Sequence, residues 1–111
     1  MRLLLFDESF GLTVMYYLNI IIPLSIKPLE RGARFEDPIC DLFDTVGGTS
    51  DIIGSGSFGN RDGLSGVEIA LRIDDLVILP LIVDILRSGG APDKSTLEFV
   101  HDGIKKFLSE C

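Results

Sequence analysis

Six consecutive residues, Gly54 to Gly59 (GSGSFG), match the G-x-G-x-x-G pattern by which some proteins bring their backbone close to phosphate groups. A dinucleotide site needs a helix directly after the glycines, but here the turn-rich segment Gly59–Gly63 and an alternating strand follow. A protein-kinase loop needs a lysine on a following strand and the H-R-D and D-F-G motifs, which this chain lacks. We therefore expect a glycine-rich edge strand or bulge that binds no nucleotide and no other cofactor.

Single reactive side chains offer little further chemistry. His101 is the only histidine and could act as a general base, with Asp102 beside it in the sequence. Adjacent residues of a strand point to opposite faces, so this adjacency predicts no catalytic pair, and we expect a surface or helix-cap histidine. Cys40 lies beside the apolar stripe of a predicted helix, which favours a packed thiol over a nucleophile. We expect no catalytic residue in this chain.

The two cysteines, Cys40 and Cys111, are far apart and form neither a disulfide framework nor a metal-ligand spacing. This usage is typical of a reducing compartment and favours a cytoplasmic location. An EF-hand register also fails, because its first ligand would fall on Phe58. The sequence therefore predicts no metal site.

Carboxylates gather on one predicted helix, where Glu36, Asp37, Asp41 and Asp44 occur within nine residues. Asp41 and Asp44 are three residues apart and share a solvent-facing side. One interpretation is a solvated helix face with acids near the helix N-terminus, where the helix dipole favours them. The other is an acidic docking surface formed by Glu36, Asp41 and Asp44.

The charge balance of the whole chain fits a merely soluble surface, and it would also favour a basic partner. Seventeen acidic residues against ten basic ones give a net charge of −7 over 111 residues. Proteins that bind nucleic acid present basic patches, and here only Lys105 and Lys106 are adjacent. The sequence thus indicates no nucleic-acid partner, whereas an acidic surface steers basic proteins toward it.

The beginning of the chain shows no membrane or export signal that we can recognise. Met1 to Phe6 (MRLLLF) is apolar, but Asp7 and Glu8 interrupt it and no cleavage site follows. The uncharged stretch Leu12–Ile26 is shorter than the roughly 20 residues of a membrane helix and contains Pro23. We expect no membrane association, an N-terminal extension over residues 1–12 and a single domain over residues 13–111.

Periodicity predicts a mixed order of strands and helices. The expected strands are Val14–Ile22, the weakly extended Thr49–Phe58, the strictly alternating Val67–Ile73 and the short Ser95–Val100. One helix is expected from Asp37-Pro38, as N-cap and first residue, to Gly47-Gly48, with Ile39, Leu42, Phe43 and Val46 on its apolar face. A second should start near Pro80, after an Asp74-Asp75 cap, and end before Gly89-Gly90; a third is expected over about Asp102–Leu108.

The order β-α-β-β-α-β predicts a ferredoxin-like α/β sandwich. Its four-stranded antiparallel sheet would carry two helices on one face, with a C-terminal helix added. The first and third strands should be central neighbours, and the second and fourth should be edges.

Several short strings agree with this fold. They are Arg34-Phe35-Glu36-Asp37-Pro38, Gly47-Gly48-Thr49, Asp62-Gly63, Gly66-Val67-Glu68-Ile69, Gly90-Ala91-Pro92 and Ser95-Thr96-Leu97-Glu98-Phe99. In this order, over Tyr16 to Val100, the chain resembles small bacterial ferredoxin-like proteins of unassigned function. Some of these are similar to immunity proteins of contact-dependent or polymorphic toxin systems. The resemblance implies the fold and brings no catalytic residues.

Three functions remain open at this point. The first is a non-enzymatic protein-binding protein, of the immunity or regulatory type, that acts through its acidic surface. The alternative is a small-molecule-binding or catalytic domain that uses the open face of the sheet, and a purely structural subunit is a third. An enzyme needs a concave pocket with converging polar groups, and a binder needs a patch.

The face of the sheet opposite the helices is expected to be apolar. If Val14, Tyr16, Leu18, Ile20 and Ile22 lie under the helices, then Met15, Tyr17 and Ile21 point the other way, with Ala70 nearby. Large apolar patches usually mark contacts, and twofold dimers are the commonest oligomers. We therefore expect a homodimer through this face, unless the terminal segments cover it.

Overall fold

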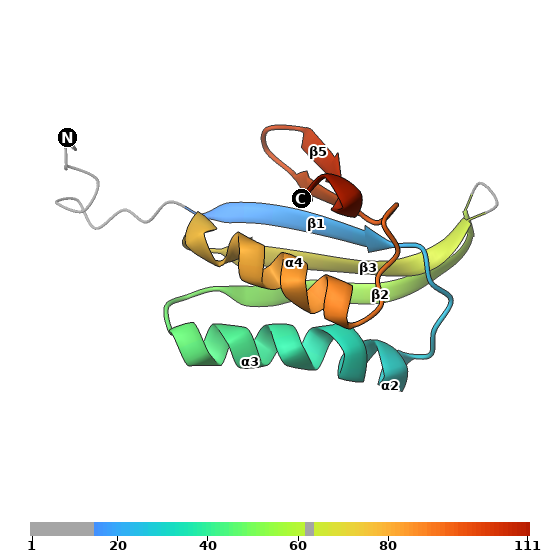
Figure 1. The fold of residues 1–111 in the computed structure, drawn as a ribbon, viewed down its shortest axis with the longest axis horizontal. Helices are drawn as coiled ribbons and strands as arrows, with labels where there is room; N and C mark the ends of the chain where they lie inside the picture. The colour runs from blue at the N-terminus through green and yellow to red at the C-terminus, as the bar shows by residue number, and fades with distance from the viewer. Residues whose placement is uncertain (1–14, 62–63) are drawn as a thin grey trace, which may run out of the picture.

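A computed structural model describes residues 15–61 and 64–111, and an antiparallel sheet of five strands forms its centre. The chain runs β1 (Tyr16–Ile22), α2 (Pro28–Arg31), the π-helical turn η1 (Gly32–Glu36), α3 (Asp37–Val46), β2 (Asp51–Arg61), β3 (Leu64–Ile73), the 3₁₀ turn η2 (Leu76–Ile78), α4 (Leu79–Ser88), β4 (Thr96–Phe99), β5 (Ile104–Phe107) and the 3₁₀ turn η3 (Leu108–Glu110). Figure 1 shows α3 and α4 packed along the sheet.

The sheet has the strand order β2-β3-β1-β4-β5. β1 and β3 are neighbouring antiparallel strands at its centre, with Leu18 opposite Leu71 and Ile20 opposite Ile69, which confirms the predicted pairing. The prediction of four strands is wrong, because β5 adds a fifth. As a result β2 is an edge strand, as predicted, whereas β4 is an interior strand and β5 takes the other edge.

The predicted C-terminal helix over Asp102–Leu108 is also wrong, because Ile104–Phe107 forms β5 and pairs with β4. Gly103 has a φ of +70°, and its amide donates to the carbonyl oxygen of Phe99 at 2.9 Å, which closes the hairpin. Asp-Gly is a strong hairpin signal, since glycine adopts positive φ without steric cost. Seven residues are also too few to make a stable helix by themselves.

The first helical connection starts earlier than predicted. Asp37 has helical backbone angles and does not cap the helix, because α2, η1 and α3 form one continuous helical segment from Pro28. Pro38 lacks an amide and its ring crowds the carbonyl of residue 34, so the regular α-helical pattern cannot continue through this position. The chain inserts a π turn there, in which the amide of Asp37 donates to the carbonyl oxygen of Gly32.

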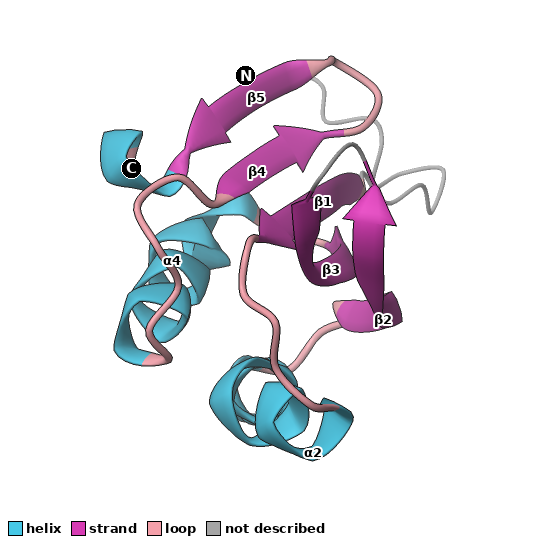
Figure 2. Cartoon of the chain, turned by 90° about the vertical axis from the view of Figure 1, so that its right-hand side faces the viewer, coloured by secondary structure: helices cyan, strands magenta, loops and turns pink. Residues whose placement is uncertain are grey.

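The second connection matches the prediction. Asp75 accepts a hydrogen bond from the amide of Val77 at 3.0 Å and caps η2. Pro80 lies in the first turn of α4, and the helix ends at Gly89. Figure 2 shows that the helical segment that begins with α2 and the helix α4 lie on the same side of the curved sheet.

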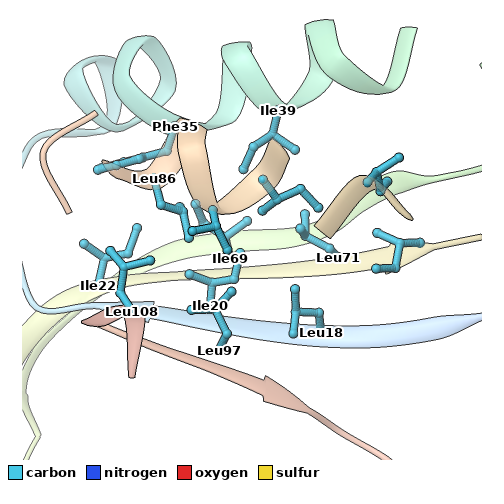
Figure 3. Packing of buried hydrophobic residues seen from close by; sticks show 14 of the residues in the cluster. Leu18, Ile20, Ile22, Phe35, Ile39, Ile69, Leu71, Leu86, Leu97 and Leu108 are labelled. Carbon is cyan, nitrogen blue, oxygen red and sulfur yellow. The ribbon is translucent and has the colours of Figure 1, made fainter. Parts of the chain in front are cut away.

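The hydrophobic core fills the space between the sheet and these helices (Figure 3). The alternation in β3 is confirmed, because Val67, Ile69, Leu71 and Ile73 are all fully buried. They pack with Leu18, Ile20 and Ile22 of β1, Phe35, Ile39 and Phe43 of the first helical segment, Ile82, Val83 and Leu86 of α4, and Leu97 and Leu108. Each such side chain contributes about 1.5–3 kcal/mol by leaving water. Val46, predicted on the same helix face, is instead 47% exposed.

β2 is longer than the predicted Thr49–Phe58 segment and continues through Arg61, so most of the expected Gly59–Gly63 loop is strand. Its pairing with β3 shifts register between Ile52 and Gly54 and again between Phe58 and Arg61. Positions 62–63 and the predicted N-terminal extension, residues 1–12, lie outside the described residues. Within the described ranges, no helix is both long and apolar enough to cross a membrane.

Candidate functional site

The outward face of α3 carries an acidic stripe, which we define as Asp37, Asp41 and Asp44. They share this face with Cys40 at the helical spacing i, i+3, i+4, i+7, and all four residues are exposed. The opposite side of the helix is anchored in the core by Ile39 and Phe43. None of the three aspartates makes an ion pair within the part of the chain that the structure describes, so their charges face solvent uncompensated.

Glu36, which the sequence placed in this surface, lies apart from it. Its carboxylate forms an ion pair with Arg31, with 3.2 Å between Oε2 and Nε, and both side chains are largely buried. Arg31 also donates to the hydroxyl of Ser57 on β2 at 2.9 Å. Glu36 thus helps to tie the helix to the sheet, and Asp37 takes its place in the stripe. Counting the helical period from Ile39 and Phe43 would have identified Asp37.

Cys40 lies in the middle of the acidic stripe and is exposed, which corrects the expectation of a packed thiol. Partial desolvation raises the pKa of the Cys40 thiol, and the negative charges of Asp44, Asp37, Asp41 and Glu36 raise it further. A thiol of raised pKa is mostly protonated near neutral pH and is a poor nucleophile. The same carboxylates therefore argue against cysteine chemistry and for a surface of negative potential.

A second carboxylate, that of Asp74, has a structural role. It accepts hydrogen bonds from the Thr49 amide at 2.7 Å and the Ser50 hydroxyl at 3.0 Å. These bonds, the Thr49 amide first, lower the pKa of Asp74. Gly48, at a φ of +91°, leaves room for this carboxylate, because a Cβ there would contact Oδ2. Asp74 thus fastens the turn between α3 and β2 to the end of β3.

The open face of the sheet, opposite the helices, combines polar and apolar side chains. The four residues predicted for a dimer interface, Met15, Tyr17, Ile21 and Ala70, are each half-buried on it. Asn19, Glu68 and Arg72 lie between them at register positions of the same face. The dimer interface therefore stays a prediction. The face through which it would form is more polar than the sequence suggested.

His101 is exposed in the β4–β5 hairpin and lies on this same side of the molecule. Its ring packs edge-on against that of Tyr17, with 5.3 Å between the centroids. The exposure of His101 matches the predicted surface histidine.

One region of the open face is concave. We call it the glycine hollow; it has a volume of about 250 Å³. Its floor is formed by Gly54, Gly56 and Ala70, and its walls by Asn19, Phe58 and Glu68. The G-x-G-x-x-G string thus lies on an edge strand, and β3 follows it in place of the helix that a dinucleotide site requires.

Comparisons with known proteins add no assignment: no protein-family model, no curated protein and no solved structure matches this chain. Among the described residues, no group of three or more histidine, cysteine, aspartate or glutamate side chains is arranged to hold a metal ion. The acidic stripe and the glycine hollow are therefore the two candidate sites, and they lie on opposite sides of the sheet.

Proposed function

We propose that this chain is a non-enzymatic protein-binding domain, of the immunity or regulatory type, that docks a basic protein through the acidic stripe. The observation that carries the proposal is the uncompensated exposure of Asp37, Asp41 and Asp44 on one face of a helix anchored in the core. A rigid helix holds the three carboxylates at fixed spacing, so little conformational entropy is lost when a partner binds.

The electrostatics of the whole chain support this role. A net charge of −7 attracts a basic protein over a distance of about one Debye length, roughly 8–10 Å at physiological salt. Such steering accelerates association and excludes acidic competitors. The stripe would supply the local complement at the end of that approach.

The proposal extends to the type of fold and the compartment. The order β2-β3-β1-β4, with both helical connections on one face, is the pattern of a ferredoxin-like domain, to which β5 would be an addition. Both cysteines are free and exposed, which favours a reducing compartment and hence a cytoplasmic location.

Cys40 offers a direct test, because it lies inside the stripe. A Cys111→Ser variant labelled at Cys40 with a photo-activated crosslinker should capture the partner in the source cell. Labelling is best done at mildly alkaline pH, since the pKa of this thiol is raised. The matched control is a Cys40→Ser variant labelled at Cys111, which is also exposed and whose carbonyl oxygen accepts a hydrogen bond from Arg87.

A basic protein captured from Cys40 but not from Cys111 supports the proposal. Its capture should weaken in Asp41→Asn/Asp44→Asn and persist in Asp93→Asn/Asp102→Asn, which removes the same charge from exposed loop positions elsewhere. Equal capture from both thiols, or capture indifferent to both charge changes, would contradict it.

The second candidate function is a small-molecule-binding or catalytic domain that uses the open sheet face. The glycine hollow favours it, because it is concave and carries converging polar groups. The hollow and the stripe share no residue, so each function can be tested without the other.

A further inference from the structure

Two glycines of β2 are required neither by a positive φ nor by packing around their Cα atoms. Gly54 and Gly56 alternate onto the open face, opposite Ala70 and Glu68 of β3. Neither has a positive φ. A Cβ at Gly56 would meet nothing within 4 Å, and one at Gly54 would make only an ordinary contact of 4.0 Å with the Ala70 methyl group.

Gly66, by contrast, is required by packing. A Cβ at Gly66 would lie 2.6 Å from the carbonyl oxygen of Ile22 and 3.0 Å from the ring of Phe58. Glycine weakens a strand, so a glycine that neither φ nor packing requires often marks a place where a ligand approaches the backbone. Gly54 and Gly56 meet this description, and they form the floor of the glycine hollow.

The walls of the hollow carry unpaired polar groups. Glu68 and Asn19 are half-buried diagonal neighbours on β3 and β1, close enough for both to contact one small group. Neither side chain makes a hydrogen bond or ion pair with any residue that the structure describes. The nearest basic side chain on β3, Arg72, is already paired with Asp51, with 3.0 Å between Nη2 and Oδ2. Glu98, opposite Asn19 on β4, adds a further negative charge to this face.

The shape limits the size and form of a ligand. A volume of about 250 Å³ corresponds to roughly eight water molecules in the liquid. The floor presents the strand backbone of the two glycines and the small methyl group of Ala70, which suits a flat group lying against it. Phe58, whose ring lies over Gly66, closes one end. A flat group with several N–H donors and a positive charge complements both the carboxylate of Glu68 and the amide oxygen of Asn19.

We propose that the glycine hollow binds a small molecule bearing a guanidinium or amidinium group, which lies over Gly54 and Gly56 and pairs with Glu68. Asn19 accepts a second hydrogen bond from the same group and fixes its orientation. The site lies on the opposite side of the sheet from the acidic stripe and does not depend on the protein-binding proposal.

The test is a titration of the ¹⁵N-labelled chain with benzamidine and agmatine, followed by amide chemical shifts. Benzamide, of the same shape as benzamidine but neutral, and ATP, which is anionic, serve as control ligands. The proposal predicts saturable shifts centred on Gly54, Gly56 and Ala70 with the two cations, at a dissociation constant on the order of 1 mM for fragments of this size. Benzamide and ATP should shift these amides at least tenfold less at the same concentration.

Variants locate the site. Gly56→Leu fills the hollow without a clash at Cβ and should abolish the shifts, whereas Gly59→Leu, on the same strand with nothing within 4 Å, should leave them unchanged. Glu68→Gln should weaken binding by at least tenfold and keeps the test decisive if Gly56→Leu folds poorly. Equal shifts with benzamidine and benzamide, or cation binding that survives both Gly56→Leu and Glu68→Gln, would overturn the proposal. So would shifts confined to the backbone amides of α3.

Discussion

Arg34 and Gly89 hold the two helical connections together. The guanidinium Nε of Arg34 donates to the carbonyl oxygen of Gly89 at 2.7 Å. The carbonyl oxygen of Arg34, which cannot accept a hydrogen bond from Pro38, lies 2.6 Å from the place that a Cβ of residue 89 would occupy. The ring of Phe35 approaches the same place to 2.7 Å. Gly89 is thus required by packing, although its φ of −79° is open to any residue.

Gly89→Ala should therefore destabilise the fold. The added methyl group must displace backbone as well as the buried ring of Phe35, and overpacking of this kind costs about 1–3 kcal/mol. Urea unfolding followed by circular dichroism measures the loss. Gly59→Ala is the matched control, because its methyl group meets nothing within 4 Å and should leave stability unchanged or slightly higher. Equal destabilisation by the two variants would contradict the packing at Arg34.

Gly103 distinguishes the observed C-terminal hairpin from the helix that the sequence suggested. With a φ of +70° and open space around it, replacement by alanine should cost about 1–2 kcal/mol through backbone strain alone. In a helix the same substitution would stabilise by up to about 1 kcal/mol. The sign of the change in the free energy of unfolding for Gly103→Ala therefore decides between the two structures.

The hydrogen-bonded carboxylate of Asp74 should make the stability of the fold depend on pH. A carboxyl whose pKa is lower in the folded than in the unfolded chain stabilises the fold above the unfolded pKa, here 3.8, and that stabilisation is lost as the pH falls through the folded pKa. The difference in unfolding free energy between wild type and Asp74→Asn should be largest near neutral pH and shrink below pH 3.8. Urea titrations at a series of pH values measure it. A constant difference down to the most acidic pH would show that the charge of Asp74 contributes nothing.

The dimer expected through the open sheet face can be tested by sedimentation equilibrium. We expect wild type to dimerise at tens of micromolar, a range in which weak association is measurable. Tyr17→Lys should be monomeric, because it places a charge among the half-buried residues of that face. Asn19 lies both in this face and in the glycine hollow, so benzamidine should shift the equilibrium toward monomer. A wild type that is monomeric throughout this range would end the dimer hypothesis.

The spacing of apolar residues predicted the central strands of the sheet well, and the elements at its edges less well. The strict alternation of Val67–Ile73 identified a strand buried on one side, and apolar β1 was its natural neighbour; the pairing of Ile20 with Ile69 confirms both. At the C-terminus, Ile104, Phe107 and Leu108 fit a helical stripe and a hairpin equally well by spacing. The positive φ at Gly103 decides for the hairpin, and Asp102-Gly103 was the local signal for it.

The candidate sites depended on side-chain partners, which spacing does not reveal. Asp41 and Asp44 were placed on the exposed face of α3 because their period is fixed by Ile39 and Phe43. Glu36 was wrongly included in this surface, because its pairing with Arg31 depends on a π turn that carries the helix back beyond Pro38. The glycine hollow could not be foreseen either, because only the register of β2 against β3 shows that Gly54 and Gly56 share a face with Glu68.

The central claim is that the acidic stripe docks a basic protein, and the association rate constant of the captured partner tests it most directly. We predict that this rate constant falls steeply as NaCl is raised, because the charges are exposed and screened. Asp41→Asn/Asp44→Asn should slow association at low salt by about tenfold and flatten its salt dependence, whereas Asp93→Asn/Asp102→Asn should do neither. A rate constant that is indifferent to salt and equal in all three proteins would contradict the account.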